Sequence, residues 1–210
     1  LTQFATEYFP QRYADRLPQQ AGAFSEKPLP EPELPASLSA DEWREALRAC
    51  KGMVLRQESY ELDVDDLTVE PPRHTPVRLY SAATHNCHIQ ILQPRGPVNR
   101  HAVFLVTESE AISYHYELAI PKGNAPLAPD PRIAHTLNLA IDEYGNILEA
   151  AAAVYPRIGS HADATLTPEQ RALINQVQKR ERHLALNCTR YTRDIDSTHV
   201  RRLRMPCQTQ

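Results

Sequence analysis

The stretch Cys87–Glu117 reads CHIQILQPRGPVNRHAVFLVTESEAISYHYE and decides the fold class of this chain. Apolar and polar residues alternate at both of its ends, which is typical of antiparallel strands with one buried face. Proline and glycine in Pro94–Pro97 (PRGP) break the first run, and the polar triplet Glu108–Glu110 (ESE) breaks the second. The pattern predicts a β-meander of three short strands and two turns, with strands over Cys87–Ile91, His101–Val106 and Ile112–Leu118.

Two turns contain residues that we expect to shape the backbone. Gly96 and Asn99 suit the first turn. Arg95 and Arg100 flank it and either anchor it by hydrogen bonds to carbonyls or carboxylates, or simply point into solvent. The second turn is DEYGN at Asp142–Asn146, where glycine and asparagine supply positive φ angles. The structural turn residues that we predict are Arg95, Gly96, Asn99, Arg100, Asp142, Gly145 and Asn146.

Alternation continues on both sides of this meander. Upstream, it predicts strands over Met53–Leu62 and Val77–Tyr80, separated by an acidic, proline-containing loop. Downstream, it predicts strands over Ile133–Ile141 and Ile147–Tyr155 and a last strand that begins at Leu184. At least six strands follow one another with short connections, so we expect an antiparallel sheet whose last strands leave an open edge.

Two helices interrupt these strands. Ser39 and Glu42 form a capping-box pattern, and Thr167–Gln170 (TPEQ) repeats this signal with proline at the first helical position. Apolar residues follow each cap at helical spacing: Trp43, Ala46, Leu47 and Cys50 in the first case, Leu173, Ile174 and Val177 in the second. We therefore predict helices near residues 40–51 and 168–180, and a mainly β fold with two helices, a β-rich α+β class.

The first 38 residues differ in composition from the rest. Aromatic residues at Phe4, Tyr8, Phe9 and Tyr13 are spaced as anchors, and Lys27–Pro35 reads KPLPEPELP, which favours an extended conformation. We predict a proline-rich strap or linker over residues 1–38 and a β-rich segment over residues 39–210. The first residue is not methionine and the last follows a strand-like basic run, so we expect a section of a longer polypeptide.

Composition excludes several classes of function. The chain has 210 residues, 41% hydrophobic and 23% charged, with a net charge of −3, which gives no electrostatic footprint for nucleic acid. No apolar run approaches the roughly 20 residues of a membrane helix, so we expect no membrane contact. The four cysteines are widely spaced, which favours buried free thiols over a disulfide framework.

The residues that could carry chemistry do not form a recognisable site. His85, Cys87 and His88 are the densest metal-capable group, but one strand face would supply only two ligands where a structural zinc site needs four. The acidic run Asp63–Asp66 lacks the glycine and terminal glutamate of a calcium loop. Arginines in Arg190–Arg204 are interleaved with aspartates, which favours ion pairing with a neighbouring strand or domain. We expect no catalytic, cofactor-binding or metal-binding residue.

Several segments together resemble the B component of the insecticidal Tc toxin complexes, in the middle-to-C-terminal region that adjoins its Rhs/YD-repeat shell. The resemblance runs from about Ser39 to Cys207, in the order of the family. Its segments are ADEWREALRACKG (40–52), VLRQESYELD (54–63), ILQPRGPVNRHAVFLV (91–106), SYHYE (113–117), DPRIAHTLNLAIDEYGNIL (130–148), RYTRDID (190–196) and RLRMPC (202–207). The turn at Asp142–Asn146 is similar to the D-x-x-G-N turn of Rhs/YD repeats, and the Pro97–Val98 pair lengthens the other turn.

This resemblance implies a secreted, non-enzymatic section of a β-sheet cocoon that encloses a cytotoxic effector. The implied partners are the rest of the parent toxin chain, the C component with its toxic C-terminal part, and the pore-forming A component through other regions of the parent. A β-rich module that binds carbohydrate or a host surface is the alternative, and it would need an exposed aromatic cluster, for which Tyr114 and Tyr116 are the candidates. A metal-dependent enzyme built on His85, Cys87 and His88 is a further alternative.

Overall fold

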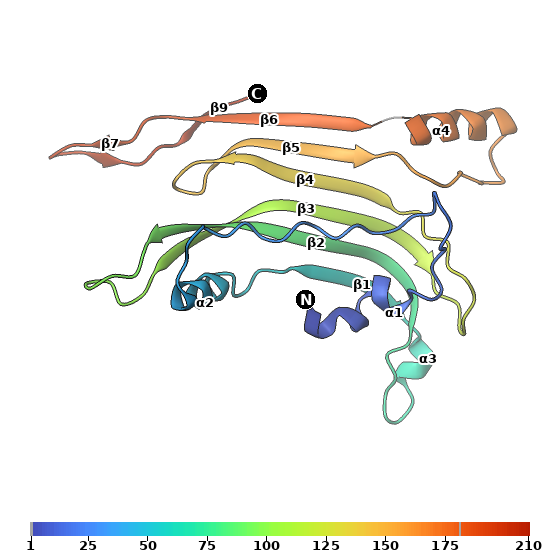
Figure 1. Cartoon of the computed structure of the whole chain (residues 1–210). Helices are drawn as coiled ribbons and strands as arrows, with labels where there is room; N and C mark the ends of the chain where they lie inside the picture. The colour runs from blue at the N-terminus through green and yellow to red at the C-terminus, as the bar shows by residue number, and fades with distance from the viewer. Residues whose placement is uncertain (1, 181) are drawn as a thin grey trace.

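The computed structural model describes residues 2–180 and 182–210, with side chains from Ala5 onward, so the side chain of Phe4 lies outside the described part. Seven strands form one antiparallel sheet in the order β1-β2-β3-β4-β5-β6-β9 (Figure 1). They span β1 Arg56–Leu62, β2 Pro76–Gln93, β3 Val103–Ala119, β4 Arg132–Ile141, β5 Ile147–Tyr155, β6 His183–Tyr191 and β9 Pro206–Thr209. A separate hairpin pairs β7 Ile195–Asp196 with β8 Arg201–Arg202. The mainly β fold class is confirmed.

Two strands are much longer than the sequence pattern predicts. The runs predicted over Val77–Tyr80 and Cys87–Ile91 belong to the single strand β2, because the small and polar residues between them also pair with a neighbour. Ala82 in this connecting stretch is buried, and the Asn86 amide donates to the Pro30 carbonyl at 3.1 Å. The prediction of separate short strands here is wrong, since small residues can occupy a sheet face that is covered by another segment.

The prediction of a turn at Glu108–Glu110 is also wrong, because β3 continues through these residues without a break. Asn86 pairs with Glu110 and Cys87 with Glu108, so Ser109 is the one extra residue of a β-bulge. Both carboxylates have partners across the sheet: Glu108 lies 2.7 Å from His85, and Glu110 lies 3.1 Å from His135. The polar triplet therefore marks a bulge that bends a long strand, and not the end of that strand.

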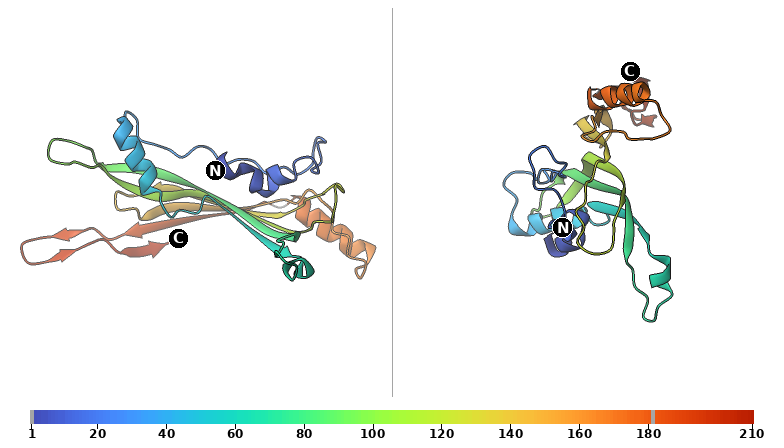
Figure 2. Two further views of the ribbon diagram at one scale, coloured as in Figure 1. Left: turned by 90° about the horizontal axis from the view of Figure 1, so that it is seen from below. Right: turned by 90° about the vertical axis from the view of Figure 1, so that its right-hand side faces the viewer.

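One face of the sheet carries a second layer, which the N-terminal part of the chain forms. Figure 2 shows this part and helix α2 Ala40–Ala49 on one side of the strands. Short helices η1 Thr2–Glu7 and α1 Phe9–Arg12 begin the layer, and the Phe9 ring of α1 packs against Tyr116 of β3. The main core cluster consists of Phe9, Tyr13, Phe24, Leu79, Ala82, Tyr114, Tyr116, Ile120 and Leu127. A smaller cluster joins Ala46 of α2 to Cys87 and Ile89 of β2.

Both predicted long helices form with the predicted caps, but only one of them packs on the sheet. Ser39 and Glu42 make the reciprocal capping box of α2. Thr167 and Gln170 exchange hydrogen bonds of 2.9 and 3.3 Å at the start of α4 Pro168–Arg180. Leu173 on the apolar side of α4 is 63% exposed, and Figure 1 shows the helix beyond the ends of β5 and β6. A third short helix is α3 Val64–Leu67.

The four cysteines are free thiols, of which Cys87 is buried. Within residues 2–180 and 182–210, no helix combines the length and apolarity needed to cross a bilayer.

The core position of Phe9 gives a stability prediction. Its ring is 1% exposed and lies 5.5 Å from Tyr13 and 5.1 Å from Tyr116, centroid to centroid. Phe9→Ala should lower the free energy of unfolding by about 3–5 kcal/mol, because it removes a large buried ring and leaves a cavity. Urea titration at constant protein concentration measures this change. Val98→Ala, at a side chain that is 93% exposed, is the control and should change it by less than about 0.5 kcal/mol. Similar effects of both substitutions would contradict this account.

Candidate functional site

The first predicted turn is attached to helix α2. The Gly96 N–H donates to the Asn99 carbonyl at 2.9 Å and closes the turn. The backbone N–H of Arg95 donates to Glu42 at 2.9 Å, and its guanidinium lies 2.9 Å from Asp41. Arg100 is exposed and has no hydrogen bond or ion pair among the described residues. Arg95 thus binds carboxylates of α2, and this contact holds the turn beside the helix.

Glu45 of α2 binds the other end of the loop that connects β2 to β3. Glu45 accepts a hydrogen bond of 2.9 Å from the Ala102 N–H and lies 2.8 Å from His101. The contacts with His101 and Ala102 lower the pKa of Glu45, and those from Ser39 and Arg95 lower the pKa of Glu42. Two adjacent turns of one helix therefore fix both ends of the β2–β3 connection.

The second predicted turn is built on Asp142. Its carboxylate accepts backbone hydrogen bonds from Tyr144 at 3.0 Å and Asn146 at 2.9 Å, and a third from the Asn146 amide at 3.0 Å. Gly145 has a φ of 85°, a left-handed conformation that glycine adopts without strain. Asp142, Gly145 and Asn146 thus lie together at one end of β4 and β5, while the residues of the first turn lie elsewhere.

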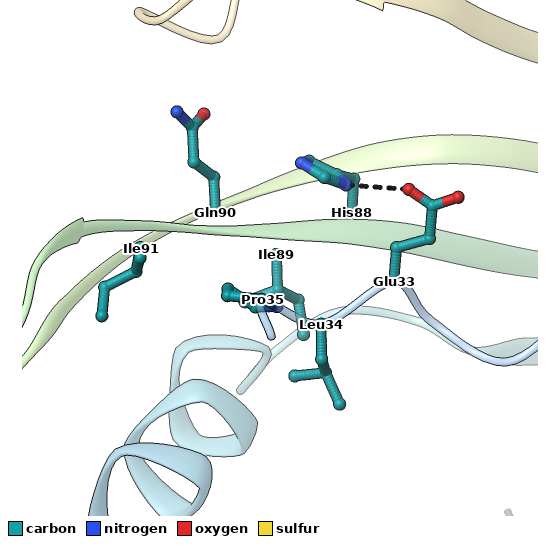
Figure 3. A pocket seen from close by; sticks show the side chains of 7 residues that line it. All are labelled: Glu33, Leu34, Pro35, His88, Ile89, Gln90 and Ile91. Carbon is teal, nitrogen blue, oxygen red and sulfur yellow. Dashed lines mark hydrogen bonds and ion pairs between the residues drawn. The ribbon is translucent and has the colours of Figure 1, made fainter. Parts of the chain in front are cut away.

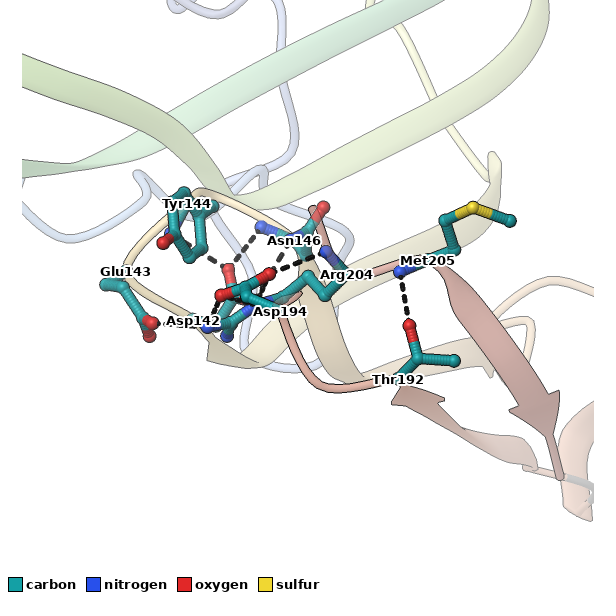
Figure 4. A network of polar contacts seen from close by, with 8 residues as sticks. All are labelled: Asp142, Glu143, Tyr144, Asn146, Thr192, Asp194, Arg204 and Met205. Atoms are coloured by element: carbon teal, nitrogen blue, oxygen red, sulfur yellow. Dashed lines mark hydrogen bonds and ion pairs between the residues drawn. The ribbon is translucent and has the colours of Figure 1, made fainter. Parts of the chain in front are cut away.

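Arg204 joins the C-terminal segment to this turn, as Figure 4 shows. Its guanidinium contacts Asp194 at 2.7 Å, Asp142 at 3.0 Å and Glu143 at 2.7 Å. It also lies 4.4 Å from the ring centroid of Tyr144, a cation–π distance. The sequence predicted ion pairs for the C-terminal arginines, and Arg204 is the residue that makes them with the β4–β5 turn.

The protonation of Asp142 reflects this network. Burial by itself raises the pKa of the carboxyl group, but the hydrogen bonds from Asn146, Tyr144 and Arg204 outweigh it and lower the pKa below the ordinary value. The pKa of Asp194 is lowered mainly by its hydrogen bonds with Arg204. The carboxylate form of both residues is therefore the one that holds the turn and the arginine together.

A buried charged cluster fastens the strap to the sheet, and sequence reasoning missed it. Arg56 of β1 contacts Glu26 of the strap and Glu58 of its own strand at 2.8 Å each, and all three side chains are at most 7% exposed. Glu58 also accepts the Phe9 N–H at 2.9 Å. Alternate charged residues on the inward side of β1 were the available signal, since apolar residues were expected there.

Tyrosines complete this cluster. The Tyr116 hydroxyl donates to Glu26, and the Tyr60 hydroxyl donates to Glu58 at 2.9 Å. Burial raises the pKa of Tyr116 and of Tyr60, and the neighbouring carboxylates raise both further. Burial likewise raises the pKa of Tyr114 to about 12. The Tyr60 and Tyr116 hydroxyl groups are therefore hydrogen-bond donors at neutral pH, and the rings of all three tyrosines pack into the core on the strap side of the sheet.

A shallow pocket of about 440 Å³ lies where the strap meets β2, as Figure 3 shows. The Ile89 N–H donates to the Glu33 carbonyl at 3.0 Å, so the strap pairs with the edge of β2 beyond the end of β1. The Glu33 carboxylate lies 3.3 Å from His88. Leu34, Pro35 and Ile91 add aliphatic groups to the lining, and Gln90 adds an amide.

The residues of the metal hypothesis are engaged in other contacts. His85 and His88 each contact a glutamate, and Cys87 is 2% exposed. Burial and the neighbouring Cys50 thiol raise the pKa of Cys87 to about 11, so the thiol form prevails at neutral pH. No group of three or more histidine, cysteine, aspartate or glutamate residues suited to a metal ion occurs in the described part of the chain.

The geometry defines the class of protein. It is a section of antiparallel sheet in which polar groups hold segments of the same chain together. A family model described as "Insecticide toxin TcdB middle/C-terminal region" matches residues 45–204. The chain therefore belongs to this family and is a TcdB-type middle region of an insecticidal Tc toxin B component. No curated protein matches the chain.

Solved structures share the fold. The crystal structure of TcdB2–TccC3 matches with a TM-score of 0.64 and 22% identity, and covers 99% of this chain. The TcdB2–TccC3–Cdc42 structure matches with a TM-score of 0.65 and 23% identity over 99% of this chain. The Photorhabdus luminescens Tc holotoxin pore matches with a TM-score of 0.60 and 22% identity over the same share. The chain spans 9% of the length of each of these solved chains.

The buried cluster gives a prediction about charge. Arg56→Met should lower the free energy of unfolding by about 3–5 kcal/mol at pH 7, because Glu26 and Glu58 would stay buried without their cation. Denaturant titration measures the loss. Arg44→Met, which removes an ion pair with Asp41 whose side chains are 72% and 57% exposed, should cost less than about 1 kcal/mol. Equal losses for the two variants would contradict a clamping role for Arg56.

The turn gives a prediction about pH. The pKa of Asp142 is lowered in the folded state, so its contribution to stability is present above the ordinary value of 3.8. It is lost as the pH falls through the folded-state pKa. Asp142→Asn should therefore be less stable than the wild type at pH 6, and the difference should shrink progressively below pH 4. Unfolding titrations between pH 2 and pH 6 measure it, and an undiminished difference at pH 2 would refute the assignment.

Proposed function

We propose that this chain is a non-enzymatic section of wall in the cocoon of a secreted Tc toxin B component. The observation that carries this proposal is the sheet itself, a single antiparallel sheet that extends through most of the chain. It ends at β1 on one side and at the short strand β9, which covers only part of β6, on the other. The polar clusters described above join segments of the chain to one another. A wall needs such internal joints, and it needs edges at which the next section can pair.

The face of the sheet opposite the strap supports an enclosing role. Cross-strand pairs show that its rows contain mainly small or polar side chains, few of them strongly apolar. The rows comprise Gln57, Ala83, Ser113, Ala134, Val154 and His183, and then His85, Ala111, Thr136, Ala152 and Ala185. A smooth surface of this kind offers few pockets or large apolar groups to a chain enclosed beside it. It can border an unfolded polypeptide without binding any one segment tightly.

The proposed partners follow from the proposed role as a section of the cocoon wall. They are the rest of the parent toxin chain, the C component with its toxic C-terminal part, and the pore-forming A component through other regions of the parent. Two relatives of the fold support this proposal by their descriptions, one in a complex with TccC3 and one in a Tc holotoxin pore. The proposed cargo is the toxic part of the C component.

The structure does not support the alternative hypothesis of a module that binds carbohydrate or a host surface. Tyr114 and Tyr116 would have to form an exposed aromatic platform, but both are buried, and their rings pack against Phe24. A carbohydrate surface would need these rings to face solvent.

Protease protection of the cargo tests the proposal in the assembled B–C complex. With the wild-type parent chain, the toxic part of the C component should survive a protease that degrades it when free. Ile89→Asp places a charge at a side chain that is 1% exposed and should abolish this protection by opening the wall. Val98→Asp makes the same chemical change at an exposed side chain and should preserve it. Cargo that stays protected although the Ile89→Asp region is itself digested would overturn the proposal.

A further inference from the structure

The outer side of β6 carries backbone groups that point away from the sheet. The Cys188 N–H and carbonyl exchange two hydrogen bonds of 2.9 Å with Gln210, on the side opposite β5. Hydrogen-bonding direction alternates along an antiparallel strand. The N–H and carbonyl groups of Leu186 and Leu184 therefore also point outward. Among the described residues, β9 and Gln210 cover this side only from Cys188 to Tyr191.

This edge lacks the features that protect free sheet edges. Native edge strands carry charged residues, prolines or bulges that discourage further pairing. Residues 184–187 read LALN and contain none of these. Leu184 is 77% exposed and Leu186 is 59% exposed. The sequence of the edge is thus that of a strand with neighbours on both sides.

We propose that the segment that follows Gln210 in the parent polypeptide continues β9 and pairs with Leu184–Asn187 as an antiparallel strand. This inference rests on the proposed function, in which the chain is a section of a longer wall. The Cys188–Gln210 pair fixes the register. The first residue after Gln210 lies opposite Asn187, the second opposite Leu186, the third opposite Ala185 and the fourth opposite Leu184.

The same chain is a better occupant than a second copy. Strand β9 already runs along β6 in this register, so its continuation needs no further loop to be closed. Directly opposed residues share a face of the sheet. The second and fourth residues after Gln210 therefore lie beside Leu186 and Leu184, and we expect them to be apolar.

Amide hydrogen exchange tests the pairing. The amides of Leu184 and Leu186 should exchange at least about 100-fold more slowly in the parent B component than in the 210-residue chain. The amides of Ala185 and Asn187, which face β5, are internal controls and should differ little. Equally fast exchange of Leu184 and Leu186 in both proteins would overturn the inference.

Disulfide trapping tests the register. In a parent chain with Cys188→Ser and Cys207→Ser, Ala185→Cys should form a disulfide with a cysteine introduced at the third residue after Gln210. These positions form a non-hydrogen-bonded pair, in which the side chains lie closest. Leu186→Cys combined with the same introduced cysteine is the matched control and should stay reduced, because the two side chains would point to opposite faces. A disulfide in the control alone would show a register shifted by one residue and would overturn the assignment.

The strand pairing and the wall function can be refuted separately. Fast exchange at Leu184 and Leu186 in a parent chain that still protects its cargo would refute the strand pairing alone. A wild-type parent chain that leaves its cargo open to protease would refute the wall function, whatever the exchange rates are.

Discussion

The pairing of β2 with β3 is the constraint on which the rest of the fold depends. Side chains alternate between the two faces of a strand, so the register of these two long strands decides which residues face the strap. The extra residue Ser109 lets Cys87 and Asn86 both serve the covered side, where Cys87 meets α2 and Asn86 binds Pro30. Without this bulge, one part of the covering layer would meet the wrong face.

The strap is held by charge as well as by apolar contact. Phe9 and Phe24 supply buried rings, while Glu26 and Glu58 enclose Arg56 between the strap and β1. A buried ion cluster adds little net stability, because the loss of hydration offsets most of the attraction between the charges. The main effect of the ion cluster is to fix the position of the strap on the sheet. A polyproline-like strap could slide along an apolar sheet, whereas a strap that must bring Glu26 to Arg56 has one favourable placement.

The sequence predicted those features that local patterns determine. The caps at Ser39 and Thr167 and the turn at Asp142–Asn146 each depend on residues within a few positions of one another. The continuity of β2 and β3 could not be predicted in this way. Glu108 and Glu110 look like a turn until His85 and His135, which are distant in sequence, satisfy them across the sheet. The Arg56 cluster was missed for the same reason, since its partner Glu26 lies in the strap.

Burial along the chain shows where this section depends on its surroundings. Buried residues run from Phe9 to Ala153, and none of the described residues after Ala153 is buried. Strands β6 and β9 are therefore held by backbone pairing and by the Arg204 contacts, with little core beneath them. Helix α4 is held by polar contacts such as the hydrogen bond from the Arg157 N–H to the Gln178 carbonyl. Elements with few buried apolar contacts open most easily. The part of the sheet nearest the uncovered edge of β6 would thus gain the most stability from a further strand. This gain explains why residues 184–187 (LALN) carry no feature that would prevent pairing.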